Sequence, residues 1–242
     1  SIVNILGSID DKIENLEKIN TNLIKLIQYK FNKIYLTYTA EDQTNIINNI
    51  VNMISGDWGK DFLEGNYCSC VKCIRGADIP MVKSCNFNKL PKRFILKRNE
   101  ERSKLKAYDV IIELSGGSPT QSTGRCCIIP ENILDHINQN LISSNFCKVL
   151  RFKEKKVAVF CYLLLSYWYD SGLFFNYELG TTGLKNLNLE AIININIKQL
   201  SEEILDVIYN NFKISYNKIV KNSNKINKFN LLKQLYLKKF FG

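Results

Sequence analysis

Apolar side chains recur with helical spacing near the start of the chain. Their steps alternate between four and three residues, which is the pattern of one buried helix face. Asn20 interrupts this apolar seam, and a single polar residue at such a position usually fixes the register and orientation of a helix pair. The pattern predicts a long helix from Ser8 to about Leu36 that packs against a partner helix. The seam positions are Ile9, Ile13, Leu16, Asn20, Leu23, Ile27, Lys30 and Ile34.

The end of the chain resembles its beginning. Residues 5–20 align without gaps against residues 212–227, and the tripeptide Lys18-Ile19-Asn20 falls on Lys225-Ile226-Asn227. Some identity arises by chance in a chain so rich in Lys, Ile and Asn, but the two segments also bracket everything between them. We therefore predict a second long helix within residues 199–242, pairing antiparallel with the first helix, residues 1–36, as a spacer.

Short apolar runs separated by turn residues fill the region between the two helices. Runs rich in β-branched residues predict strands, and longer periodic runs predict helices. Residues 37–198 are therefore expected to form an α/β or α+β domain of mostly short strands. The expected strands are Val71–Ile74, Arg93–Lys97, Val110–Leu114, Cys126–Ile129 and Cys147–Phe152, and the expected helices are Glu41–Ile54, Pro130–Asn140 and Val157–Asp170.

Two loops combine glycine with polar side chains. The segment Asp109–Arg125 begins as a predicted buried strand and continues as a loop of Gly, Ser, Thr, Pro and Gln that ends on Arg125. The segment Gly180–Asn188 has two glycines, two threonines, Lys185 and amide side chains. Both loops present backbone N–H groups, hydroxyls and carboxamides suited to phosphate oxygens or base edges. The alternative is that they are ordinary surface turns.

The charge of the chain favours a polyanionic partner. The formal net charge is +10, and the pI is near 9.1. A Lys- and Asn-rich composition also follows from an AT-rich genome, so the charge alone does not decide. The basic run between Lys83 and Lys106 contains interleaved aromatic residues, and it forms either a solvated face or a phosphate-contacting ridge. Its basic members are Lys83, Lys89, Lys92, Arg93, Lys97, Arg98, Arg102, Lys104 and Lys106.

The sequence offers little catalytic chemistry. It lacks both the P-loop pattern and G-x-G-x-x-G, and its single histidine, His136, would have to serve any Ser–His or Cys–His nucleophile. The cysteines Cys68, Cys70, Cys73 and Cys85 could supply four zinc thiolates, but their C-x-C-x-x-C spacing is not that of paired knuckles. We expect free thiols instead, with no catalytic residue, metal or cofactor in this chain.

The most apolar segment, Val157–Trp168, is too short to span a membrane, for which about 18 or more residues are needed. No secretory signal is visible at the N-terminus, where acidic residues come early. The chain is expected to be cytoplasmic, without a membrane partner.

Several segments together resemble the DNA-sequence-specificity subunit of type I restriction–modification enzymes. They are Gly56–Gly59 (G-D-W-G), Cys73–Pro80 (C-I-R-G-A-D-I-P), Asp109–Arg125, Ser144–Cys147 (S-N-F-C), Phe174–Asn188 and the N-terminal helical run Ile5–Asn20. The resemblance implies a target-recognition domain with flanking helices that pack antiparallel and act as a ruler on double-stranded DNA. It also implies that modification subunits, which hold S-adenosylmethionine and methylate adenine, dock on the helices. A separate restriction subunit would translocate and cut DNA.

The resemblance assigns DNA contact to the two polar loops and to nearby basic and aromatic residues. Gln121 suits adenine and Arg125 suits guanine, each through two hydrogen bonds. The expected DNA contacts are Trp58, Arg75, Lys92, Arg93, Ser115, Gly116, Gly117, Ser118, Thr120, Gln121, Ser122, Thr123, Arg125, Thr181, Thr182, Lys185 and Asn186.

The sequence departs from the family pattern in two ways. It has one recognition domain instead of two, which favours either the C-terminal half of a longer subunit or a half-subunit that forms a homodimer; the absence of an initiating Met favours a fragment. The usual Pro-Pro-Leu-x-x-Gln entry to the second helix is replaced by Ile197–Glu203. Two alternatives stay open. One is the recognition arm of a single-chain methyltransferase–endonuclease, and the other is a helical adaptor that does not read DNA.

Overall fold

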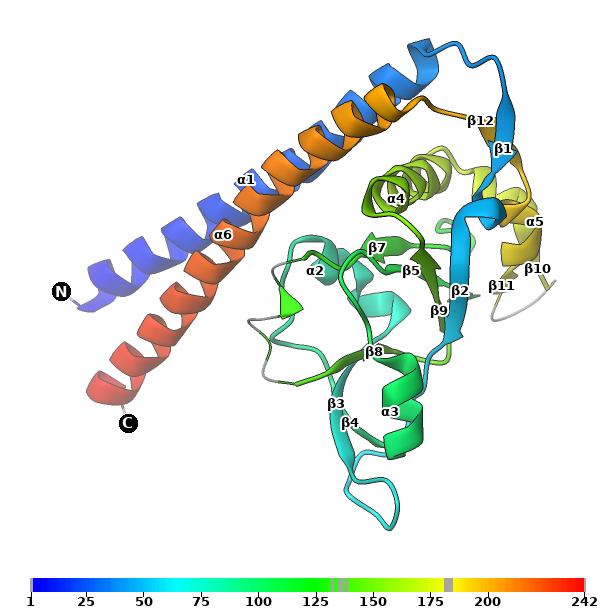
Figure 1. Cartoon of the computed structure of the whole chain (residues 1–242). Coiled ribbons are helices and arrows are strands. Elements are labelled where there is room, and N and C mark those ends of the chain that lie inside the picture. The colour runs from blue at the N-terminus through cyan, green and yellow to red at the C-terminus, as the bar shows by residue number, and fades with distance from the viewer. Residues whose placement is uncertain (1, 132, 135–136, 138, 181–184, 242) are drawn as a thin grey trace.

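Two long antiparallel helices form a rod that carries a globular domain at one end (Figure 1). The computed structural model describes residues 2–131, 133–134, 137, 139–180 and 185–241. The first helix, α1, spans Ile2–Thr37, and the last, α6, spans Glu202–Phe241. The predicted pair of long helices around a mixed α/β domain is therefore confirmed. None of the described helices is long and apolar enough to cross a membrane.

The polar seam residue Asn20 lies inside the rod. It is 1% exposed, and its Oδ1 accepts a hydrogen bond of 2.9 Å from Asn222 Nδ2 of α6. Nearer the domain the prediction fails at Lys30, which is exposed, because Phe31 takes the buried position. Phe31 packs against the Phe160 ring of the domain at 6.2 Å between centroids. At this end the buried face of α1 turns from its partner helix towards the domain.

A four-stranded antiparallel sheet forms the centre of the domain, in the order β2-β9-β5-β7. All four residues of β5 are buried, as expected for an apolar β-branched run. Helix α4 lies between this sheet and the rod (Figure 1), and one continuous apolar core runs from the sheet through α4 into α1 and α6. The elements are β2 (Ile50–Ser55), β5 (Val110–Glu113), β7 (Cys126–Ile128), β9 (Cys147–Phe152) and α4 (Lys155–Asp170).

A smaller lobe is built on a second sheet in the order β4-β3-β8. β3 pairs antiparallel with β4 and parallel with β8, around a small core of Val71, Cys73, Ile95 and Ile142. Its elements are β3 (Ser69–Ile74), β4 (Lys92–Ile95), β8 (Leu141–Ser143) and α3 (Lys97–Ser103). Between the lobes, η2 (Gly76–Asp78) leads into α2 (Ile79–Lys83), which packs beside β7.

The two chain crossings between rod and domain pair with each other. β1 (Gln43–Asn45) lies antiparallel to β12 (Asn196–Lys198). Lys198 then donates from Nζ to the carbonyl oxygens of Tyr35 and Tyr38 at the end of α1, at 2.9 and 2.6 Å. A cation at these unpaired carbonyls stabilises the helix C-terminus and fixes where the rod enters the domain.

The remaining elements are short. A third sheet has the order β10-β11-β6. Its strands are β10 (Glu178–Leu179), β11 (Lys185–Leu187) and β6 (Ser115–Gly116), and nearby are the helices η4 (Leu173–Tyr177) and α5 (Leu189–Ile193).

Three predicted elements need comment. The predicted helix Glu41–Ile54 is wrong: the segment forms β1, the short helix η1 (Ile46–Asn49) and β2, because pairing with β9 and β12 outweighs the helical spacing of its isoleucines. The predicted strand Arg93–Lys97 ends at Ile95, where α3 follows. The predicted helix Pro130–Asn140 lies partly outside the described residues.

Candidate functional site

Segments that are far apart in the sequence meet where the strands of the two lobes end. Residues that follow β3, β5 and β8 lie beside residues that precede β7 and β9. Backbone hydrogen bonds join them, from Ser144 N to Ile74 O at 2.8 Å and from Asp57 N to Ser143 O at 2.9 Å. A cavity of about 310 Å³ opens at this place, and we call it the strand-end cavity. It is lined by Trp58, Arg75, Gly76, Ala77, Glu113, Ser115, Arg125, Ser144 and Phe146.

Carboxylates hold the two guanidinium groups in the wall of this cavity. Arg125 donates through Nε and Nη2 to the two Glu113 oxygens at 2.9 and 2.5 Å. Arg75 donates in the same way to Asp78 at 2.8 and 2.9 Å. The side chains of Glu113 and Asp78 are only 2% and 7% exposed. The hydrogen bonds to these carboxylates raise the pKa of each arginine. Because both carboxylates use the Nε side, the end-on Nη1/Nη2 edge is left for another bidentate partner.

The predicted base-contacting loop closes in a tight turn. Ser118 N donates to Gln121 O at 2.7 Å, and Gly117 and Thr120 are exposed around the turn. The Gln121 carboxamide lies beside Arg125, and with its oxygen turned towards the guanidinium that oxygen is 3.2 Å from Nε and 3.3 Å from Nη1. Nη1 carries a second N–H, which remains on the end-on edge. Gln121 and Arg125 therefore form one polar unit at the edge of the strand-end cavity.

Two residues of the same loop point inwards. Ser122 and Thr123 are 3% and 0% exposed, and Thr123 N donates to Glu178 Oε1 at 2.7 Å. The neighbouring Gly124 has φ of 113°, and a side chain there would collide with the Phe174 ring. Ser122 and Thr123 were expected to contact DNA, but side chains buried to this extent cannot reach a DNA surface. These residues hold the loop in place.

The second polar loop joins the first through β-strand pairing. Asn186 lies opposite Ser115, whose hydroxyl donates to the Asn186 carboxamide oxygen. Lys185 forms an ion pair of 2.7 Å with Glu178. Burial acts to raise the pKa of Glu178, but the hydrogen bonds from Lys185 and Thr123 outweigh it and lower that pKa. Thr181 and Thr182, also predicted to contact DNA, lie outside the described residues.

The predicted basic ridge divides into exposed and buried members. Lys92 is exposed on β4, whereas Arg93 is 4% exposed. Arg93 donates from Nε to Trp58 O at 2.7 Å, forms an ion pair with Asp61, and places its guanidinium 4.0 Å from the Trp58 ring centroid. Arg93 therefore fixes the Trp58 turn and cannot reach a phosphate, whereas its strand neighbour points outwards. Lys97, Arg98, Arg102, Lys104 and Lys106 are also exposed.

The cysteines of the predicted zinc alternative lie in different surroundings. Cys73 is part of the small-lobe core and Cys85 of the main core, and burial raises the pKa of each thiol to about 12. Cys68 is exposed. In the part of the chain that the structure describes, no three His, Cys, Asp or Glu side chains gather as metal ligands.

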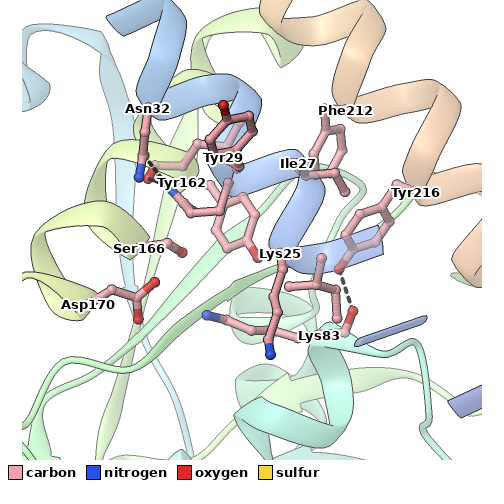
Figure 2. Close-up of a pocket in the computed structure, with 13 residues that line it drawn as sticks. Lys25, Ile27, Tyr29, Asn32, Lys83, Tyr162, Ser166, Asp170, Phe212 and Tyr216 are labelled. Carbon is pink, nitrogen blue, oxygen red and sulfur yellow. Dashed lines mark hydrogen bonds between the residues drawn. The ribbon is translucent and has the colours of Figure 1, made fainter. Parts of the chain in front are cut away.

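A second cavity, of about 300 Å³, lies where α1, α2, α4 and α6 meet (Figure 2). Two hydrogen bonds between its lining residues cross from one element to another. Gln28 donates to Leu163 O at 3.1 Å, and Tyr216 donates to Lys83 O at 3.1 Å. Tyr162 and Phe212 pack edge to face with 6.2 Å between ring centroids. These contacts make the cavity part of the joint between rod and domain.

Comparison with known proteins shows the fold. No family model and no curated protein matches the sequence. Among solved structures, the type I restriction–modification S subunit from M. genitalium matches 100% of this chain and 60% of its own chain, with a TM-score of 0.59 and 14% identity. The chain thus spans less than two thirds of that protein's length.

Two further solved structures match less well. An HsdS subunit from Thermoanaerobacter tengcongensis has a TM-score of 0.46 and 10% identity, over 98% of this chain and 55% of its own. A chain of a type I R-M system has a TM-score of 0.47 and 11% identity, over 98% and 57%.

Proposed function

We propose that this chain is a non-catalytic DNA-recognition unit of a type I restriction–modification specificity subunit, which reads one half of a split target in the cytoplasm. The observation that carries the proposal is the shared fold with the M. genitalium S subunit over the whole chain. A second observation supports it: Ser115 and Gly116 of the first polar loop pair with Asn186 and Lys185 of the second in one small sheet, next to the strand-end cavity.

DNA contact in this proposal divides between two surfaces. Exposed Lys and Arg side chains on β4 and α3 bind phosphates and position the duplex. Gln121, the end-on edge of Arg125 and the exposed Asn186 reach base edges, because their donors and acceptors match adenine or guanine. Arg93, Ser122 and Thr123 are left out of the proposed contacts because they are buried.

The rod serves as a spacer. At 1.5 Å per residue, the 36 residues of α1 and the 40 of α6 correspond to about 54 and 60 Å. Beyond the domain the rod exposes apolar side chains, among them Leu231 at 59%, Leu235 at 57% and Phe240 at 53%. The run Asn230-Leu-Leu-Lys233 resembles Asn22-Leu-Ile-Lys25, which adjoins the domain in α1, at an offset one residue longer than that of residues 5–20 and 212–227. We propose that a second recognition domain packs there, from a longer chain or from a second copy.

The proposed partners follow from the same assignment. The modification subunit docks on the rod, holds S-adenosylmethionine and methylates adenine, and the restriction subunit supplies translocation and cleavage. This chain contributes no cofactor. The recognition arm of a single-chain methyltransferase–endonuclease would contact DNA in the same way and would differ only in where the catalytic part is attached.

Fluorescence anisotropy with a labelled random-sequence duplex at two salt concentrations tests the proposal. We expect binding that weakens steeply with salt, because each phosphate contact releases counterions. Selection of bound sequences from a random library should then return one half-site. A helical adaptor that does not read DNA would bind neither duplex nor library in a salt-dependent way, and that result would overturn the proposal.

A further inference from the structure

A base that stays paired is read by side chains that project from the protein into a DNA groove. The strand-end cavity is instead a recess in the protein surface, which can receive a group from the DNA. From its shape and lining we propose that it binds one unstacked nucleobase of the DNA, with a preference for guanine. This inference rests on the proposed function and adds a second mode of base contact to the one made by the loops. The volume of about 310 Å³ is within the usual range of small-molecule pockets.

The charges around the cavity favour a neutral ligand over a phosphate. Arg75 and Arg125 bring two positive charges, and Asp78 and Glu113 bring two negative charges at hydrogen-bond distance. The paired charges cancel, so little attraction remains for a phosphate. The rest of the lining includes Ala77 and aromatic rings, which suit a planar heterocycle.

Two aromatic side chains, Trp58 and Phe146, are part of the lining. Trp58 is fixed by the Arg93 guanidinium, which lies 4.0 Å from its ring centroid, and by the hydrogen bond from Arg93 to its carbonyl oxygen. Phe146 comes from the loop between β8 and β9 and is 50% exposed. A base that leaves its stack loses contact with its neighbours, and stacking on such rings replaces that contact.

Close backbone packing around Glu113 fixes the Arg125 side chain on the polar side of the cavity. A side chain at Gly76 would collide with Glu113 Oε1, and a Cβ at Gly116 would lie 2.6 Å from the same oxygen. Glycine at both positions lets the Glu113 carboxylate lie against the backbone and orient Arg125. In the cavity, Arg75 is held by Asp78 in the same way, and its end-on edge supplies two N–H donors. On the major-groove edge of the bases, guanine alone offers two adjacent acceptors, O6 and N7, which fit these donors.

Binding to an unpaired base tests the inference, because an unpaired base costs less to unstack. The probes are a labelled duplex of random sequence, the same duplex with one unpaired guanine, and the same duplex with one unpaired thymine. The full chain should bind the unpaired-guanine probe at least roughly tenfold more tightly than the paired duplex, with a smaller gain for thymine.

Variants assign this gain to the cavity. Phe146→Ala should abolish it and leave the Kd for paired duplex within about twofold, because one stacking surface is lost and the loops are intact. Arg75→Gln should reduce the difference between guanine and thymine. Phe62→Ala is the matched control, since this phenylalanine is 80% exposed in the loop between β2 and β3 and does not line the cavity. Far-ultraviolet circular dichroism verifies that each variant is folded.

The outcomes separate the two claims. If no probe binds in a salt-dependent manner, the proposed function fails. If all three probes bind with salt dependence and equal affinity, or if Phe146→Ala retains the gain, DNA binding stands and the nucleobase site is overturned.

Discussion

Removing Arg125 alone should destabilise the protein as well as alter DNA binding. Its guanidinium is the observed partner of Glu113, whose side chain is 2% exposed. Arg125→Ala would leave that carboxylate buried without a cation, and breaking a buried ion pair in this way costs about 3–5 kcal/mol. Because the Arg125 side chain is itself 22% exposed, water can partly replace it. We therefore expect a loss at the lower end, about 3 kcal/mol.

Urea unfolding followed by circular dichroism measures this loss. With a urea dependence of about 1–3 kcal/mol per molar, the unfolding midpoint of Arg125→Ala should fall by at least about 1 M. The double variant Glu113→Gln with Arg125→Met has no buried charge at this place, so it should recover most of the midpoint. Its DNA affinity then reports the base contact without the folding defect.

An exposed ion pair provides the matched control. Lys18 and Glu14 lie 2.6 Å apart on α1 with side chains 65% and 63% exposed. Lys18→Ala should cost no more than about 0.5 kcal/mol, because solvent screens such pairs. If Arg125→Ala unfolds at the same urea concentration as Lys18→Ala, the reasoning from the buried Glu113 carboxylate is refuted.

Three further predictions follow from burial. Iodoacetamide at pH 8 should modify Cys68 first and leave Cys85 and Cys147 intact in the native protein, because burial raises the pKa of both thiols to about 12; mass spectrometry showing uniform labelling would contradict this. Lys92→Ala should weaken binding to all DNA sequences and lower the slope of log affinity against log salt concentration by about 1, which fluorescence anisotropy measures; an unchanged slope would argue against a phosphate contact. Arg93→Ala should chiefly lower the midpoint of urea unfolding. Replacing both Asn20 and Asn222 by Leu should raise the urea midpoint, because apolar contact then replaces an amide pair in which Asn20 is buried, at some loss of register specificity; a lower midpoint would show that the amide pair stabilises the rod.

Elements with one strong local signal could be predicted from the sequence. The seam of α1 and the repeat in α6 predicted two long helices, because a helix period sustained over many residues has few alternatives. The apolar run of β5 predicted a buried strand because it is rich in β-branched residues. The segment Glu41–Ile54 has no such clear signal. Its isoleucines fit one helix face but also suit short strands, and only the partners β9 and β12 decide between these structures.

The candidate site was predicted in part. Asp109–Arg125 and Gly180–Asn188 stand out in the sequence for their glycines and polar side chains, and the structure joins them through Ser115 and Asn186. The sequence could not show that Arg125 binds Glu113, that Arg75 lines the same cavity, or that Arg93 is buried beside exposed Lys92. Such facts depend on which way each side chain leaves its strand and on contacts between distant segments, such as the parallel pairing of β3 with β8.

Under the proposed function, two recognition domains must be held at a fixed distance on a split DNA target. The contacts between rod and domain would keep each domain in a fixed position on the rod. The apolar core continues without a break from the central sheet through α4 into both rod helices. Tyr108 of the domain and Tyr209 of α6 share a hydrogen bond of 3.0 Å, and Lys198 binds the end of α1. Each chain crossing is also paired in a strand. Since a flexible linker at this joint would let the loops swing relative to the rod, the spacing of the proposed half-sites depends on this joint as well as on the length of the helices.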